Sequence, residues 1–80
     1  CGTGAGMAIA ANRYHGVYAA LAWNVETARL AKEDDNANVL VLPSDYVSCE
    51  LAHEMVTAWL LAEFKQGRYA QRIKMIDAIR

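Results

Sequence analysis

The chain opens with a cysteine and a glycine-rich segment, Cys1-Gly2-Thr3-Gly4-Ala5-Gly6, placed directly before an apolar run. Glycines let backbone N–H groups approach an anion closely, and a helix that follows adds the positive end of its dipole. The thiolate of Cys1 is favoured there, so Cys1 is a candidate base or nucleophile. The alternatives are a tight strand-to-helix turn for the glycines and a small buried hydrophobe for the cysteine. Neither the dinucleotide-binding fingerprint nor a P-loop matches, because the third glycine is spaced differently and no GK[ST] follows.

Two further pairs of polar residues are candidates for binding. Arg68 and Arg72 are four residues apart, so they share a helix face and can clamp a phosphate or carboxylate; a solvated charged face is the commoner explanation. Asp34 and Asp35 end a predicted helix, where the dipole disfavours negative charge, so a functional role is possible. Because these two lead into the amino end of a strand, we expect them across the sheet from a site at its carboxyl edge, unless a neighbouring subunit brings them in.

The remaining cysteine and the two histidines indicate no further chemistry. Cys49 falls in the first turn of an amphipathic segment with no nearby base, and His15 and His53 have no Cys, Asp or His at metal-ligand spacing. The sequence therefore predicts no metal site. With two cysteines in the chain, reduced thiols are the expected state.

Apolar periodicity and helix-breaking residues divide the chain into alternating elements. We expect a buried helix over 7–14, a strand over 17–23, a helix from an Asn24 cap to about 34, a strand over 38–43, a helix from a Ser48 cap to about 64, and a helix over 68–79. The strand over 38–43 is continuous, rich in valine and ended by proline, which predicts a parallel strand covered on both faces. The alternation predicts the α/β class with a doubly wound parallel, Rossmann-like sheet. Two strands cannot form such a sheet unaided, so we expect this chain to be only its C-terminal half.

The composition is that of a small folded domain. Of the 80 residues, 55% are hydrophobic and 21% charged, which argues against disorder and allows one domain. A net charge of −1 provides no strong field for nucleic acid or anionic lipid. No apolar run has the length of a membrane span, and no basic start precedes an apolar segment as in a signal peptide. We therefore expect a soluble, cytoplasmic protein that binds neither nucleic acid nor membrane.

The two ends of the chain carry motifs of one known family. Residues 1–13 read CGTGAGMAIAANR, the middle of the chain contains ARLA, NANVL and AWL, and the last part reads FKQGRY followed by Arg72. This pattern resembles the ribose-5-phosphate isomerase type B and galactose-6-phosphate isomerase family, whose ending is FxGGRHxxR. The resemblance covers essentially the whole chain without gaps, and the two end motifs together are specific.

The resemblance implies an aldose–ketose isomerase that acts on a phosphorylated sugar without a metal or organic cofactor. In the family, the cysteine that matches Cys1 moves a proton between C2 and C1, and the threonine that matches Thr3 supports it. An enediolate needs preorganised donors where its charge develops. The further matches are the backbone N–H groups at Gly2, Gly4 and Gly6 for the enediolate, and Arg68 and Arg72 for the phosphate. The family also implies a homo-oligomer, a dimer or tetramer, with the site at the subunit interface.

Three departures from the family pattern concern the site. The family's ring-opening histidine falls at Asp34, and the asparagine beside it falls at Asp35. We expect Asp34 as a catalytic acid and Asp35 as a substrate-binding residue, although an aspartate begins ionised at neutral pH unless its surroundings favour the acid form. Tyr69 stands where the family usually has histidine, and Gln66 replaces the first of two glycines. The family's N-terminal half, with an Asp-His pair that touches the substrate, has no counterpart in these residues.

Two functions follow from this resemblance. The first is a sugar-phosphate isomerase of the ribose 5-phosphate to ribulose 5-phosphate type, with residues 1–80 as the C-terminal portion of its single domain. The second is a catalytically silent sugar-phosphate-binding member or partner subunit, suggested by the missing histidine. Cys1 and Thr3 favour the isomerase, because a silent relative has little need of a base.

Overall fold

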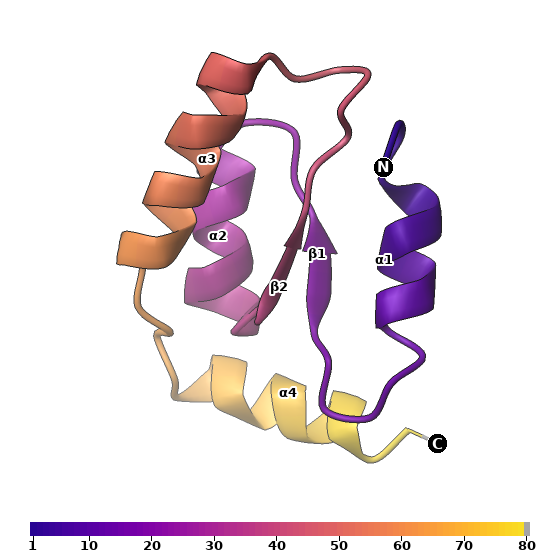
Figure 1. The fold of residues 1–80 in the computed structure, drawn as a ribbon. Coiled ribbons are helices and arrows are strands. Elements are labelled where there is room, and N and C mark those ends of the chain that lie inside the picture. The colour runs from indigo at the N-terminus through magenta and orange to yellow at the C-terminus, as the bar shows by residue number, and fades with distance from the viewer. Residues whose placement is uncertain (80) are drawn as a thin grey trace.

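The computed structural model describes residues 1–79, in which two parallel strands lie between layers of helices (Figure 1). The elements are α1 (Ala5–Ala11), β1 (Ala19–Leu21), α2 (Val25–Asp35), β2 (Val39–Val41), α3 (Cys49–Leu61) and α4 (Arg68–Asp77). β1 and β2 pair in parallel, with Ala19 opposite Val39 and Leu21 opposite Val41. Helix α1 covers one face of the strands, α2 and α3 lie on the other, and α4 crosses beneath their amino ends. The predicted α/β class with helices on both faces of a parallel sheet is confirmed.

Two of the helices begin at the caps that the sequence predicts. The side chain of Asn24 accepts a hydrogen bond from Thr27 N at 2.8 Å, and Thr27 Oγ1 accepts one from Asn24 N at 3.3 Å. Ser48 Oγ accepts a hydrogen bond from Leu51 N at 3.0 Å and starts α3. Each bond satisfies an N–H group that has no acceptor inside its helix, so these side chains fix where α2 and α3 begin.

The core lies between α2, α3 and the strands. Ala22, Ala28 and Met55 are fully buried, and the small alanine side chains let α2 approach the strands closely. The partly buried side chains that pack around them are Val25, Leu40, Leu42, Val47, Leu51 and Trp59. Met55 and its neighbours confirm the apolar stripe predicted for the third helix. No helix among residues 1–79 combines the length and apolar character needed to cross a membrane.

The first helix differs from the prediction, because α1 has no buried residue. Met7 is 57% exposed and Ile9 is 63% exposed. Helix α1 rests on the strands with one face, and no other element among residues 1–79 packs over its outer side. Val39, the first residue of β2, is 36% exposed, so β2 is not covered on both faces along its whole length as predicted.

The connection between α3 and α4 turns back onto α2. Helix α3 ends at Leu61, earlier than predicted, because Ala62 adopts an extended conformation. Lys65 N then donates a hydrogen bond to Glu33 O at 2.9 Å, which holds this connection against the end of α2. Gln66 and Gly67 have positive φ angles of 64° and 61°, and α4 starts directly after them. Arg80, which directly follows the helix predicted over 68–79, lies outside the described residues.

Two asparagine side chains fix the segment between α1 and β1. Asn12 Oδ1 accepts a hydrogen bond from Ala19 N at 2.8 Å, and Asn12 Nδ2 donates one to Ala19 O at 2.9 Å. Asn38 Oδ1 accepts from Tyr18 N at 2.8 Å, and its Nδ2 donates to Gly16 O at 2.9 Å. These amides replace hydrogen bonds that the irregular segment does not form with itself, so the entry into β1 has a defined conformation.

Candidate active site

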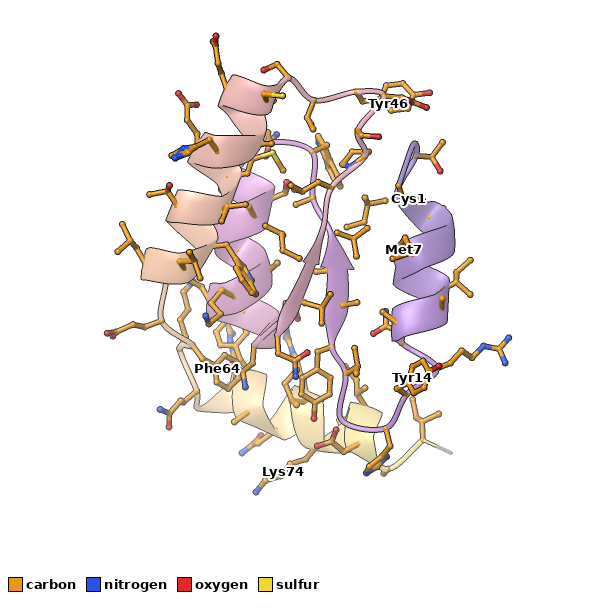
Figure 2. The ribbon with its side chains drawn as sticks, in the orientation of Figure 1. Cys1, Met7, Tyr14, Tyr46, Phe64 and Lys74 are labelled. Carbon is orange, nitrogen blue, oxygen red and sulfur yellow. The ribbon has the colours of Figure 1, made fainter. Side chains whose placement is uncertain are left out.

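Cys1 is held at the carboxyl ends of the strands by the segment that follows β2. Ser44 donates to Cys1 O twice, from its backbone N at 2.9 Å and from its Oγ at 3.2 Å. Asp45 N donates to Gly2 O at 2.9 Å. Figure 2 shows Cys1 beside Tyr46, at the opposite end of the molecule from Phe64 and Lys74. The carboxyl edge of a parallel sheet is where ligands bind in α/β folds, and Cys1 lies at that edge.

Close packing favours glycine at the start of the loop, most clearly at Gly4. Gly4 has a φ of 84°, and an added Cβ would lie 2.3 Å from Leu21 Cδ1 and 3.3 Å from Val41 Cγ1. At Gly2 the added Cβ would lie 2.7 Å from Asp45 Oδ2. The tight-turn interpretation of the glycines therefore holds at Gly4, whatever else the loop does. Gly6 has open space around it and lies in the first turn of α1, where N–H groups lack an intrahelical acceptor.

The thiol itself is accessible. Cys1 is exposed, so its interpretation as a small buried hydrophobe is wrong. A hollow of about 270 Å³ lies beside it, lined by Cys1, Met7, Ala11 and residues 39–42. Thr3 is also exposed, and its Oγ1 accepts a long hydrogen bond of 3.4 Å from Ala5 N. The loop thus presents a thiol, a hydroxyl and backbone N–H groups beside an apolar wall.

The other predicted site residues lie at the opposite edge of the sheet. Asp34 and Asp35 end α2, while Arg68 and Arg72 belong to α4, which crosses beneath the amino ends of the strands. Asp35 lines a separate open groove of about 800 Å³ between the 12–20 segment and α4. The predicted residues are therefore not brought together within one chain. The separation expected from the direction of the strands is confirmed.

Asp34 has a cationic partner that the sequence analysis missed. Lys65 Nζ lies 3.1 Å from Asp34 Oδ1 and 3.6 Å from Glu33 Oε1, and Glu33 Oε2 also accepts a hydrogen bond from Arg29 at 2.8 Å. The interaction with Asp34 raises the pKa of Lys65 above its ordinary value. The Asp34 carboxyl group is therefore engaged in an ion pair on its own chain, a contact that the sequence did not predict.

Tyr69 is the second residue that the sequence analysis missed. Arg68 donates a hydrogen bond of 3.4 Å to Tyr69 Oη, which raises the pKa of the Arg68 guanidinium. The sequence analysis noted only that Tyr69, inside the closing FKQGRY motif, stands where the family usually has histidine. Among residues 1–79, no three carboxylate, imidazole or thiol side chains lie close enough together to bind a metal ion.

A parallel sheet covered by helices, with a cysteine and a glycine loop at its carboxyl edge, places the chain in the Rossmann-like α/β class, whose members bind ligands at that edge. The family model described as ribose/galactose isomerase matches residues 1–76. Ribose-5-phosphate isomerase B of Escherichia coli (strain K12) is 42% identical over 79 residues, which are 99% of this chain and 53% of that protein. The chain therefore belongs to the ribose/galactose isomerase family, as its end motifs predict.

Solved structures of related proteins agree with this assignment. The ribose 5-phosphate isomerase of Thermotoga maritima superposes with a TM-score of 0.96 at 49% identity, covering 99% of this chain and 55% of that one. Ribose-5-phosphate isomerase B of Mycoplasma genitalium, solved with bound ribulose-5-phosphate, gives a TM-score of 0.94 at 45% identity, covering 96% and 51%. The chain spans about half the length of the relatives it matches.

Proposed function

We propose that this chain is the C-terminal portion of a single sugar-phosphate isomerase domain. The reaction is the interconversion of an aldose phosphate and a ketose phosphate, of the ribose 5-phosphate to ribulose 5-phosphate type, in the cytoplasm and without a metal or organic cofactor. Family membership supports the reaction class, and the Mycoplasma genitalium relative was solved with ribulose-5-phosphate bound. The observation that carries the proposal is the exposed thiol of Cys1, a residue whose backbone carbonyl is held by Ser44 at the start of the glycine loop.

In this reaction Cys1 is the base. Its thiolate removes the proton from C2 of the open-chain aldose, the C–H electron pair becomes the C1–C2 double bond, and negative charge moves to O1. Return of the proton to C1, with transfer of the hydroxyl proton from O2 to O1, gives the ketose. The backbone N–H groups at Gly2, Gly4 and Gly6 stabilise the enediolate oxygen, and Thr3 supports Cys1.

The residues at the other edge complete the site from a second copy of the chain. Arg68 and Arg72 bind the phosphate with charge-assisted hydrogen bonds, and Asp35 contacts the sugar. Asp34, whose Oδ1 lies 3.1 Å from Lys65 Nζ, accepts the proton of the anomeric hydroxyl as the ring opens and returns it through water to the ring oxygen. Since the end of α2 and helix α4 lie at the opposite end of the strands from Cys1 in one chain (Figure 1), the proposal requires a homo-oligomer, a dimer or tetramer, with each site between two subunits.

The base is tested by Cys1→Ala in the full-length protein. We expect kcat to fall by several orders of magnitude while KM changes little, because the thiolate acts on the transition state. Cys49→Ala is the matched control, since Cys49 is also an exposed free cysteine but lies in α3. A Cys1→Ala enzyme within about tenfold of wild-type kcat would refute the assignment.

The shared site is tested by mixing two inactive variants. Cys1→Ala and Arg68→Ala subunits, refolded together at equal concentrations, should recover about a quarter of wild-type activity, because half of the dimers are mixed and each carries one intact site. A site built within one chain would recover none. This outcome separates an error about the subunit arrangement from an error about the base.

The alternative is a catalytically silent sugar-phosphate-binding member of the same family. The observation that favours it is the ion pair of Asp34 with Lys65, at the position where the family has a titrating histidine. Ribulose 5-phosphate added to the wild-type full-length protein distinguishes the two functions. Binding without interconversion supports the silent member, and turnover supports the isomerase.

A further inference from the structure

Three cationic side chains surround one aromatic ring at the start of α4. Lys65 Nζ lies 5.4 Å from the centroid of the Tyr69 ring, Arg68 Cζ lies 5.2 Å away and Arg72 Cζ lies 5.6 Å away. The three cations come from both sides of Tyr69 in the sequence, because the left-handed residues Gln66 and Gly67 bring the connection against the first turn of α4. Like charges repel at this spacing, so the cluster needs a group that holds it together.

The three cations differ in how their charge is compensated. Lys65 is paired with Asp34 and Glu33. Within the described part of the chain, no carboxylate lies in ion-pair distance of Arg68 or Arg72. The two arginines are therefore gathered by an aromatic ring and by the Tyr69 hydroxyl, and their positive charge stays uncancelled.

This difference has a chemical consequence for an anionic ligand. A carboxylate that held the arginines would neutralise them and occupy the N–H donors that a phosphate needs. The face of an aromatic ring attracts a guanidinium through its quadrupole and takes none of its charge. A ring can therefore hold two guanidinium groups close together before the phosphate arrives, which lowers the ordering cost of binding.

We propose that Tyr69 is the positioning residue of the phosphate site, whose ring holds Arg68 and Arg72 together and keeps both guanidinium groups available for the ligand. The inference rests on the proposed role of these arginines in binding phosphate. Tyr69, at a position where the family usually has histidine, thus holds the two arginines that bind phosphate. Of the three cations around the ring, Lys65 pairs with Asp34, and Arg68 and Arg72 bind the ligand.

Substitution of the ring in the full-length protein tests the inference. Tyr69→Leu should weaken binding of inorganic phosphate and of ribulose 5-phosphate by about 5- to 30-fold, the sum of two weak cation–ring contacts. KM should rise by a similar factor while kcat at saturation stays near the wild-type value. Tyr69→Phe keeps the ring and should restore affinity to within about twofold. Tyr14→Leu removes an exposed tyrosine that contacts no cation among residues 1–79, and should change neither constant.

A series of fluorinated phenylalanines at position 69 changes the charge distribution of the ring and keeps its shape, so a loss of affinity cannot be due to misfolding. Phenylalanine carrying zero, one, two or three ring fluorines at position 69 has nearly constant size, while the attraction of its face for cations falls with each fluorine. Phosphate affinity should decrease stepwise along this series. A flat series would overturn the inference, as would a Tyr69→Phe variant that binds as weakly as Tyr69→Leu.

The variants Arg68→Ala and Arg72→Ala distinguish two errors: a wrong role for Tyr69 and a wrong phosphate site. If Arg68→Ala and Arg72→Ala weaken phosphate binding but the fluorinated series is flat, the arginines bind phosphate and Tyr69 does not position them. If neither arginine variant weakens phosphate binding, the proposed phosphate site itself is wrong.

Discussion

A single methyl group added at Gly4 is expected to destabilise this fold strongly. The backbone there has a φ of 84°, in the left-handed region that residues with a Cβ rarely adopt. The added Cβ would also lie 2.3 Å from Leu21 Cδ1. Gly4→Ala therefore combines a conformational cost with a steric one, and the two can be measured separately.

The size of each contribution follows from the geometry. The left-handed conformation costs an alanine about 1–2 kcal/mol. Forcing extra volume into a packed contact costs about 1–3 kcal/mol, and because Leu21 is 37% exposed and can move aside, the lower part of that range applies. The free energy of unfolding should therefore fall by about 2–4 kcal/mol in total.

The assay is urea unfolding of the full-length protein, with Gly6→Ala as the matched control. Gly6 lies in α1 with nothing within 4 Å of an added Cβ, so Gly6→Ala should stabilise by about 0.5–1 kcal/mol. Repeating Gly4→Ala in a Leu21→Ala background removes the steric obstruction. The loss in that background should shrink to the conformational term of about 1–2 kcal/mol.

Three results would refute this reasoning. A loss below about 1 kcal/mol for Gly4→Ala would mean that the loop does not need the left-handed conformation. Equal losses in the two backgrounds would mean that Leu21 is not the obstruction. A loss for Gly6→Ala as large as that for Gly4→Ala would mean that any side chain in the loop is harmful, whatever its local geometry.

Two other substitutions have expected outcomes in the same unfolding assay. Gln66 has a φ of 64°, so Gln66→Gly should raise the free energy of unfolding by about 1 kcal/mol, and a decrease would show that the Gln66 side chain makes a stabilising contact. The pKa of Lys65 is raised by Asp34, so this pair stabilises the fold below the ordinary lysine pKa of 10.5 and its contribution is lost as pH rises through the raised value. Lys65→Met should therefore be less stable than wild type at neutral pH, with the difference shrinking in strongly alkaline solution; a difference independent of pH would contradict the ion pair.

The sequence predicts those parts of the fold that depend on interactions between residues close together in the chain. The Asn24 and Ser48 caps depend on residues within three positions, and both helices begin where those side chains bond. The exposure of α1 could not be predicted in this way. Its apolar sequence indicates that a cover is needed, but whether the same chain supplies that cover depends on elements far away in sequence.

The candidate site likewise has residues whose positions the sequence predicts and a cluster that it does not predict. The position of Cys1 at the carboxyl edge, and of Asp34 at the opposite one, follows from strand direction alone, so both were predictable. The cluster around Tyr69 was not, because it depends on the connection between α3 and α4 folding back onto the end of α2. This folding back depends on Gln66 adopting a left-handed conformation, which a glutamine rarely does, and the one signal in the sequence is that Gln66 replaces a glycine of the family motif.

The amide of Asn12 has a consequence for how copies of this protein can meet. Ala19 turns its N–H and C=O away from β2, toward the outer edge of β1, and Asn12 occupies both groups. An edge strand with free backbone groups is a template on which another chain can add a strand. The Asn12 side chain acts as a one-residue substitute for that strand, so a further strand cannot pair with Ala19, the first residue of β1, unless Asn12 moves away.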